Sequence, residues 1–241
     1  MKILVTSGGT KVPIDRVRDI TNMSKGTFGS KISEQLLKLD QDVFFLKSKG
    51  SKSPMSATVD FAANNHGEPV MATVENAQAL YTRYFEHWRE MEYTTFNQYR
   101  DCLEHIVKVE KPDVVVLAAA ASDYGVANFV NGKMRSNDDY KIFLEPLPKL
   151  IHYIKEWLPT AKLVGFKLLV ESTPHGLIAA AKRSIADNKC DLMVANDLQD
   201  IKDNKHRVFI VRPDGSDTLY NTDPNDSNYL ARMVAENIIK I

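Results

Sequence analysis

The sequence predicts an α/β fold with a doubly wound, mostly parallel sheet in a single domain. Apolar runs at residues 3–5 and 114–121 lack the polar alternation of half-exposed strands and are typical of buried parallel strands. Segments with apolar residues at helical spacing alternate with such runs, which favours a parallel sheet between helices. No repeat or linker interrupts this order, so we expect residues 1–241 to form one Rossmann-like domain, extended by a β-hairpin and a flap.

The composition narrows the class of protein further. The chain has 31 Lys and Arg against 31 Asp and Glu, so its zero net charge argues against a nucleic-acid-binding protein. No apolar run reaches membrane-spanning length, and the N-terminus lacks the pattern of a signal peptide. Cys102 and Cys190 are isolated and the six histidines lack ligand spacing, so we expect neither a disulfide nor a protein-bound metal. We expect a soluble, cytoplasmic protein that does not associate with membranes.

The remaining elements follow from periodicity and from residues that start or stop helices. In the first half we expect a helix after residue 29, a strand at 42–46, a polar surface segment at 47–67, a strand at 70–74, and helices at 76–93 and 94–109. In the second half we expect a flap at 125–141, helices at 148–157, 174–188 and 228–241, strands at 162–168 and 191–195, and a hairpin of 207–211 with 218–220. Thr173 and Pro174 are a good start for their helix.

Two loops rich in small residues connect the first strand to the first helix. The first, TSGGT at 6–10, follows the strand, and the second, SKGTFG at 24–29, leads into the helix. Glycines allow backbone N–H groups to turn toward an anion, and a helix N-terminus favours negative charge. The spacing matches neither the dinucleotide fingerprint nor the Walker pattern. The loops therefore predict a phosphate-binding α/β protein, with a plain tight turn as the alternative for Gly8-Gly9.

Two further features point to the same edge of the sheet. The strand at 114–121 ends in alanines before Asp123, and small side chains at the carboxyl end of a strand let a ligand approach. A turn-capping role is the alternative for Asp123. The segment 125–141 is polar and carries Lys133, Arg135 and Lys141, which suggests a mobile, positively charged flap or, alternatively, a solvated loop.

Motifs in the same order along nearly the whole chain resemble those of a known family. They lie at 6–13, 17–26, 117–124, 132–134, 148–150, 164–168 and 194–197. The chain resembles phosphopantothenoylcysteine synthetase (phosphopantothenate–cysteine ligase) of coenzyme A biosynthesis, in its stand-alone form. The resemblance implies a ligase that joins 4′-phosphopantothenate and L-cysteine through an acyl-cytidylate or acyl-adenylate and releases pyrophosphate. It also implies CTP or ATP as co-substrate, Mg²⁺ held by the phosphates, and a homodimer.

The resemblance assigns roles to particular residues. Those implied to line the nucleotide are Gly8, Ser24, Gly26, Gly29, Phe166 and Asn196. Those implied to contact phosphopantothenate or the acyl intermediate are Asn22, Ala119, Ala120, Asp123 and, across a dimer interface, Arg18. Lys133 is implied to stabilise charge on the reacting phosphate, and Asn22 is the other catalytic candidate.

The nucleotide and the class of function each keep an alternative. Ser184 and Asn188 stand where CTP-using fused enzymes of the family carry a lysine pair, so ATP stays open beside a slight preference for CTP. A NADP-dependent Rossmann-type reductase is one rival, because the KSK sequence at 47–49 could suit a 2′-phosphate, although the glycine fingerprint is missing. A non-catalytic nucleotide-binding regulator is the other.

Overall fold

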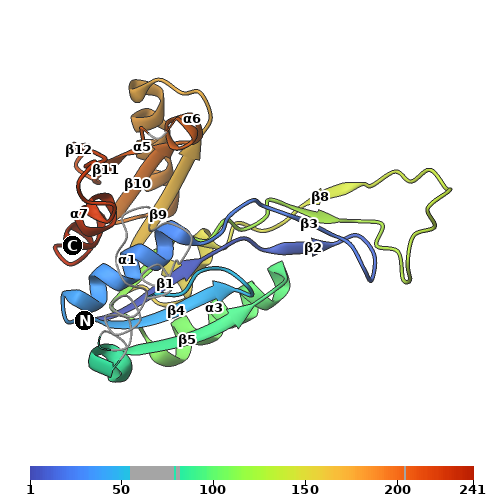
Figure 1. Ribbon diagram of the computed structural model, residues 1–241, viewed down its shortest axis with the longest axis horizontal. Coiled ribbons are helices and arrows are strands. Elements are labelled where there is room, and N and C mark those ends of the chain that lie inside the picture. The colour runs from blue at the N-terminus through green and yellow to red at the C-terminus, as the bar shows by residue number, and fades with distance from the viewer. Residues whose placement is uncertain (55–78, 80–81, 204) are drawn as a thin grey trace, which may run out of the picture.

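The computed structural model describes residues 1–54, 79, 82–203 and 205–241 (Figure 1). The strand expected at 70–74 and most of the surface segment expected at 47–67 therefore lie outside the described residues. Within the described ranges, no helix is both long and apolar enough to cross a membrane.

The described part of the chain contains an eight-stranded sheet with the order β12-β11-β10-β9-β6-β1-β4-β5. Its strands are β1 (Lys2–Ser7), β4 (Asp42–Ser48), β5 (Trp88–Tyr93), β6 (Val114–Leu117), β9 (Lys162–Leu169), β10 (Leu192–Asp197), β11 (Arg207–Val211) and β12 (Asp217–Asn221). The pairs from β5 to β10 are parallel, and β11 and β12 add an antiparallel hairpin. The predicted doubly wound, mostly parallel sheet and its hairpin are confirmed.

Helices cover both faces of this sheet, which explains the uninterrupted apolar strands. α1 (Thr27–Lys38) and α7 (Tyr229–Ile238) pack on one face, and α3 (Phe96–Glu110), α4 (Ile151–Trp157) and α5 (Pro174–Asn188) pack on the other. Ile3 and Val5 contribute to the first core and Leu4 to the second, and all three are fully buried. A strand buried on both faces needs apolar residues at every position.

Side-chain caps begin two of these helices as their sequences suggest. The Thr173 hydroxyl accepts a hydrogen bond from the Gly176 N–H, and Pro174 occupies the first helical position, as predicted for α5. Thr95 and Gln98 form a reciprocal capping box at the start of α3. Such caps satisfy N–H groups that have no partner within the helix.

The prediction of a helix at 76–93 is wrong for the C-terminal part of this range. Helical structure covers 82–84 and a 3₁₀ turn, η2 (Phe85–His87), after which β5 runs parallel to β4. Lys47 of β4 lies 3.2 Å from Glu90 and 3.3 Å from Glu92, so ion pairs join the two strands. Pairing along the open edge of β4 therefore overrides the predicted helix, because strand pairing is a tertiary contact that local spacing does not report.

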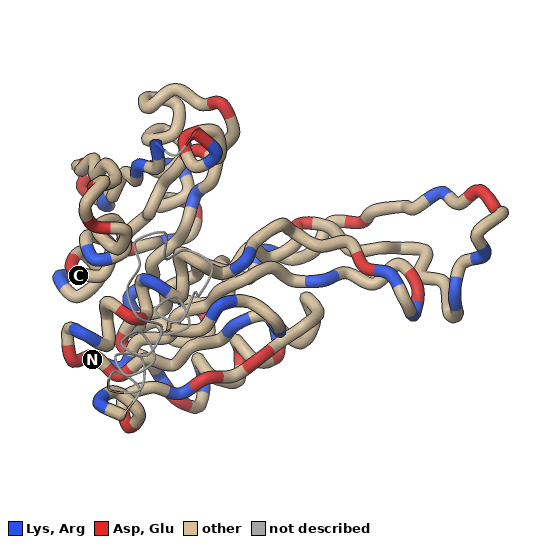
Figure 2. The backbone as a smooth tube through the Cα atoms, in the orientation of Figure 1, with Lys and Arg blue, Asp and Glu red and all other residues tan. Residues whose placement is uncertain are grey.

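Two small antiparallel ribbons extend from the sheet as one arm (Figure 1). β2 (Lys11–Pro13) pairs with β3 (Asp19–Thr21), and β7 (Tyr124–Val126) pairs with β8 (Leu144–Pro146). The second ribbon carries the expected flap at its outer end, whereas the first ribbon was not expected. Figure 2 shows basic and acidic residues interspersed along the arm.

Candidate functional site

The candidate site lies where the strand order of the sheet reverses. From β1 the chain continues to β4 on one side, and from β6 it continues to β9 on the other. In open parallel sheets, ligands bind at the carboxyl ends of strands at such a point. The loops that follow β1 and β6 are joined there, because Ala120 N–H donates to Gly8 O at 2.8 Å and Thr10 N–H donates to Ala120 O at 3.3 Å. Gly8 and Ala120, which were predicted separately, are thus neighbours.

Asn22 covers the junction of these two loops. Its Nδ2 donates to the carbonyl oxygens of Ala120, at 2.9 Å, and Ala121, at 3.2 Å. A Cβ atom on Gly9 would come within 2.7 Å of the Asn22 carbonyl oxygen, so only glycine fits beneath this segment. The predicted substrate residues Asn22, Ala119 and Ala120 therefore come together at one edge of the sheet.

The two glycine loops pack against each other through Ser7. Ser7 Oγ donates to the Gly26 carbonyl oxygen at 3.0 Å, and Cβ atoms on Gly26 and Gly29 would lie 2.8 and 2.6 Å from Ser7 Oγ. Gly26 is the N-cap of α1, with a φ of 72°, and no side chain of the described residues caps this helix. Within the described part of the chain, the first N–H groups of α1 therefore meet no side-chain acceptor, an arrangement suited to a phosphate.

Two buried tyrosines hold the first loop in place. Tyr93 donates through its hydroxyl to the Ser7 carbonyl oxygen at 2.8 Å, and Tyr99 donates to Thr6 Oγ1 at 3.2 Å. Burial raises the pKa of Tyr99 to about 12 and raises the pKa of Tyr93 as well, so both stay protonated donors at neutral pH. Tyr99 lies in the helix predicted at 94–109, and the sequence indicated no separate role for it.

A cluster of aromatic side chains lies on β9 and beside β10, where Phe166 and Asn196 were predicted to face the nucleotide. The Phe28 ring lies 6.2 Å from Phe166 and 5.2 Å from His206, both edge to face. Asn196 Nδ2 and His206 Nε2 are 3.5 Å apart, and burial lowers the pKa of His206 and so favours its neutral form. Sequence reasoning missed Phe28 and His206, although an aromatic residue inside the second glycine loop was a usable signal.

Asp197 of the 194–197 motif has a structural task instead. Its carboxylate accepts from the N–H groups of Ser172, at 2.8 Å, and Gln199, at 2.8 Å, which caps the short helix α6 (Leu198–Lys202). These backbone hydrogen bonds hold the pKa of Asp197 below its usual value. Asp197 thus ties the end of β10 to the loop after β9.

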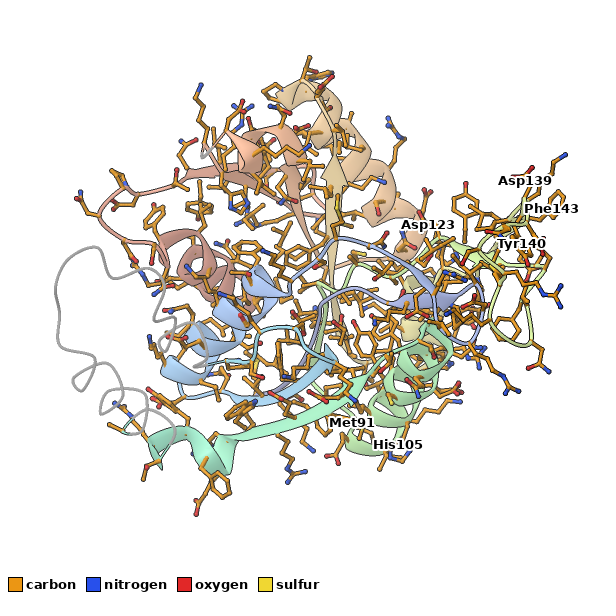
Figure 3. The ribbon with its side chains drawn as sticks, turned by 45° about the vertical axis from the view of Figure 1, so that its right-hand side comes forward. Met91, His105, Asp123, Asp139, Tyr140 and Phe143 are labelled. Atoms are coloured by element: carbon orange, nitrogen blue, oxygen red, sulfur yellow. The ribbon has the colours of Figure 1, made fainter. Side chains whose placement is uncertain are left out.

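Asp123 lies at the root of the arm, and Asp139, Tyr140 and Phe143 lie further out (Figure 3). The Asp123 carboxylate forms an ion pair with Lys149, and both of these side chains are exposed. Lys149 belongs to the 148–150 motif, so two motifs far apart in sequence meet here. The charge of Asp123 is thereby balanced at the edge of the site.

Arg18 and Lys133 lie on the arm, away from the glycine loops. Buried Asp15 accepts hydrogen bonds from the Arg18 guanidinium, at 2.5 Å, and from Met134 N–H, at 3.0 Å, so the flap is bonded to the β2–β3 turn. Arg16 N–H donates to Gly132 O at 3.0 Å beside Lys133. Among the described residues, no hydrogen bond or ion pair links Arg18 or Lys133 to residues 6–10 or 24–29. Within one chain, Arg18 and Lys133 therefore lie on two bonded segments of the arm, the β2–β3 turn and the flap. Both are separated from the other predicted site residues.

Ser184 and Asn188 also lie away from the site. They occupy the last turns of α5, which ends before the amino end of β10, at the opposite edge of the sheet. There Asn188 Nδ2 donates to the Ser184 carbonyl oxygen at 2.7 Å. Within one chain, Ser184 and Asn188 are therefore not placed to contact a nucleotide at the glycine loops. Their identity does not indicate by direct contact whether that nucleotide is CTP or ATP.

The mostly parallel sheet, with helices on both faces, and the loops at its switch point define a Rossmann-like α/β protein. The chain belongs to the DNA/pantothenate metabolism flavoprotein C-terminal domain family, whose model matches residues 1–97 and 90–241. This membership confirms the resemblance seen in the motifs.

Named relatives agree with this family. The chain is 33% identical over 213 residues to the coenzyme A biosynthesis bifunctional protein CoaBC of Thermococcus kodakarensis, covering 88% of this chain and 45% of that protein. It is 29% identical over 249 residues to phosphopantothenate–cysteine ligase CAB2 of Saccharomyces cerevisiae, covering 86% of this chain and 67% of that protein. The chain thus spans less than half of the first relative and about two thirds of the second.

Solved structures share the whole fold. The DNA/pantothenate metabolism flavoprotein from Streptococcus pneumoniae has a TM-score of 0.75 at 28% identity, with 100% of this chain and 97% of that chain covered. A Cab2 mutant in complex with phosphopantothenate-cysteine has a TM-score of 0.84 at 27% identity, with 99% and 85% covered. None of these relatives is described as a reductase or a regulator, so neither alternative has support.

Proposed function

We propose that this chain is a nucleotide-dependent ligase that joins 4′-phosphopantothenate to L-cysteine in coenzyme A biosynthesis. The observation that carries the proposal is the junction of Gly8, Ala120 and Asn22 at the switch point of the sheet, in a chain that matches the family over its full length. The relatives with the same fold include proteins described as phosphopantothenate–cysteine ligases.

The reaction needs activation because a carboxylate does not form an amide until a good leaving group is attached. In the first step a carboxylate oxygen of phosphopantothenate forms a bond to the α-phosphorus, and the bond to pyrophosphate breaks. In the second step the cysteine amine attacks the acyl carbon, loses a proton and displaces the nucleoside monophosphate. Both reactants of the first step are anions, so the protein must place positive charge and N–H donors around the phosphate.

The nucleotide is proposed to lie along the start of α1. Gly8, Ser24, Gly26 and Gly29 would face its phosphates, because the two loops pack together around Ser7 and no described side chain caps the N-terminus of α1. Phe166 and Asn196 would contact the base and ribose, together with Phe28 and His206, which lie beside them.

Phosphopantothenate is proposed to bind beside the nucleotide, at the end of β6. Ala119 and Ala120 present small side chains there, and Asn22 lies over them. Asp123 follows in the same loop, and its ion pair with Lys149 keeps it at the edge of the crevice. This order would place the carboxylate of the substrate near the loops that hold the α-phosphate.

A homodimer is proposed because Arg18 and Lys133 lie too far along the arm to serve the glycine loops of their own chain. The arm exposes large apolar side chains, including Val17 at 64%, Phe143 at 60% and Leu144 at 52% exposed. Such residues on a projecting element favour contact with another protein surface. We propose that the arm packs on a second copy and delivers Arg18 and Lys133 to that copy's site.

CTP and ATP both remain candidates for the co-substrate. Mg²⁺ would be held through the nucleotide phosphates, since the described residues contain no group of three His, Cys, Asp or Glu side chains that could hold a metal ion. When bound, Mg²⁺ would supply further positive charge to the triphosphate.

The test is pyrophosphate release with phosphopantothenate and either CTP or ATP, with and without cysteine. We expect release that depends on phosphopantothenate, and the faster nucleotide identifies the co-substrate. Nucleotide binding without any release would favour the regulator, and no binding of either nucleotide would overturn the proposal.

A further inference from the structure

The segment 48–52, which follows β4, forms one wall of a cavity next to the two glycine loops. The cavity has a volume of about 660 Å³. Its opposite wall comes from the segment between β2 and α1, including Asn22 and Ser24. The family motifs do not include segment 48–52, yet this segment shares the cavity with residues proposed to contact the nucleotide and the substrate.

Lysines from both walls line this cavity. They are Lys11, Lys25, Lys49 and Lys52. Lys11 is paired with Asp19 at 3.5 Å, whereas Lys25 and Lys49 have no ion-pair partner within the part of the chain that the structure describes. Asp and Glu are absent from the described lining of the cavity. The cavity is therefore positively charged, in a chain whose net charge is zero.

The same segment packs directly on the glycine loops. A Cβ atom on Gly8 would lie 2.0 Å from Ser48 Oγ, and one on Gly26 would lie 3.1 Å from Ser51 Cβ. Lys52 N–H donates to the Lys25 carbonyl oxygen at 3.1 Å, which joins the two walls of the cavity. The lysines thus lie next to the loops that would hold the α-phosphate.

Lys47 anchors the beginning of this wall. Its side chain is 10% exposed, and its ammonium lies 3.2 Å from a Glu90 oxygen and donates to Ser53 Oγ at 2.7 Å. A buried lysine needs such partners, because an unpaired buried charge is costly. The anchor fixes both ends of segment 48–52, so Lys49 and Lys52 belong to an ordered wall of the cavity.

We propose that Lys25, Lys49 and Lys52 bind the β- and γ-phosphates of the nucleotide and the pyrophosphate that leaves. This inference rests on the proposed ligase function. When the carboxylate oxygen bonds to the α-phosphorus, the bond from that phosphorus to the bridging oxygen breaks, and the electron pair stays on pyrophosphate. Ammonium groups beside that oxygen stabilise the charge that develops there.

The phosphate of phosphopantothenate is the other possible source of an anion for this cavity. The nucleotide polyphosphate is favoured by chain continuity, since Lys25 immediately precedes Gly26, the N-cap of α1. If the α-phosphate lies at the N-terminus of α1, the β- and γ-phosphates would extend into the cavity, within reach of the Lys25 side chain.

The test measures binding to full-length protein by calorimetry, with pyrophosphate, a nucleoside triphosphate, the matching monophosphate and 4′-phosphopantothenate as probes. Lys25→Met and Lys49→Met are each expected to weaken pyrophosphate and triphosphate binding about tenfold. Binding of the monophosphate is expected to change less than about twofold, since it lacks the β- and γ-phosphates. Exposed Lys240→Met is the matched control, and Lys25→Arg should retain more binding than Lys25→Met because it keeps the charge.

Three results would overturn the inference. They are unchanged pyrophosphate affinity in both variants, an equal loss for monophosphate and triphosphate, or a loss confined to phosphopantothenate, which would assign the cavity to that substrate. Because binding is measured without turnover, the result stands apart from the ligase assay. An inactive wild-type protein with lysine-dependent pyrophosphate binding would reject the proposed function and keep this site.

Discussion

The side-chain amide of Asn22 donates a hydrogen bond of 2.9 Å to the carbonyl oxygen of Ala120. This contact joins residues 98 positions apart, and it closes the segment before α1 over the loop after β6. The amide uses its donors on Ala120 and Ala121, so the Oδ1 side of Asn22 is left for other partners.

Asn22→Asp is expected to reduce pyrophosphate release about a hundredfold, because a carboxylate cannot donate to the two carbonyl oxygens and adds negative charge beside the phosphates. Asn22→Ala should lose about tenfold, since it removes the donors without adding charge. Exposed Asn97→Asp on α3 is the control and should keep full activity. Near-normal turnover in Asn22→Asp would remove this residue from the catalytic site.

Gly8→Ala is expected to destabilise the protein more than Gly50→Ala. Both glycines have positive φ, 84° and 80°, so each substitution carries a backbone cost of about 1 kcal/mol. Among the described residues, a Cβ atom on Gly8 meets an obstacle, Ser48 Oγ at 2.0 Å, whereas one on Gly50 meets none, and this clash adds about 1–3 kcal/mol of overpacking. Chemical denaturation measures the difference in the free energy of unfolding.

A double variant tests the clash between the Cβ atom at position 8 and Ser48 separately. Ser48→Gly removes the obstructing atoms, so the double variant Gly8→Ala/Ser48→Gly should recover part of the lost stability. Equal losses for Gly8→Ala and Gly50→Ala would mean that segment 48–52 moves away easily and is not a firm wall of the nucleotide site.

Lys133→Gln is expected to lower turnover about a hundredfold or more while nucleotide affinity stays the same, because the lysine is proposed to stabilise charge on the reacting phosphate. Lys141→Gln, another lysine of the flap, is the control and should retain turnover. Unchanged turnover in Lys133→Gln would exclude the residue from the mechanism.

Mixed dimers test whether the arm acts on the partner. A dimer of one Lys133→Gln chain and one Asn22→Asp chain has one intact site if Lys133 serves the other copy, and none if it serves its own. We therefore expect activity to return when the two inactive variants are co-expressed. Persistent inactivity of purified mixed dimers would contradict delivery across the dimer.

Acid is expected to loosen the attachment of the flap through Asp15. Backbone hydrogen bonds from Met134, Val17 and Arg18 and the Arg18 guanidinium lower the pKa of Asp15 to about 2, from 3.8. Because the folded-state pKa is depressed, the stabilisation is present above pH 3.8 and is lost as the pH falls toward 2. The protection of the Met134 amide, measured as its hydrogen-exchange rate relative to the intrinsic rate at each pH, should fall over this window.

Asp15→Asn should show fast exchange at Met134 already at neutral pH and little further change in acid. Asp19→Asn, on the same ribbon, is the control and should leave Met134 protected. Slow exchange in Asp15→Asn at neutral pH would show that other contacts hold the flap.

The sequence by itself determined the features whose cause is local. Ile3, Leu4 and Val5 predicted a strand buried on both faces, Thr173 and Pro174 predicted the start of α5, and the glycines at 8 and 26 predicted the loops now found at the site. In each case neighbouring residues alone carry the physical reason, which is burial on both faces, a capped N–H or a positive φ.

Tertiary structure decided what depends on distant partners. β5 is a strand because the open edge of β4 and Lys47 are available to it, although a helix was predicted over 76–93. His206 joins Asn196 and Phe28 only because β11 returns antiparallel beside β10. Arg18 and Lys133 lie apart from the glycine loops because Asp15 holds the flap against the β2–β3 turn on the arm. These contacts join segments far apart in the chain, and no local periodicity records them.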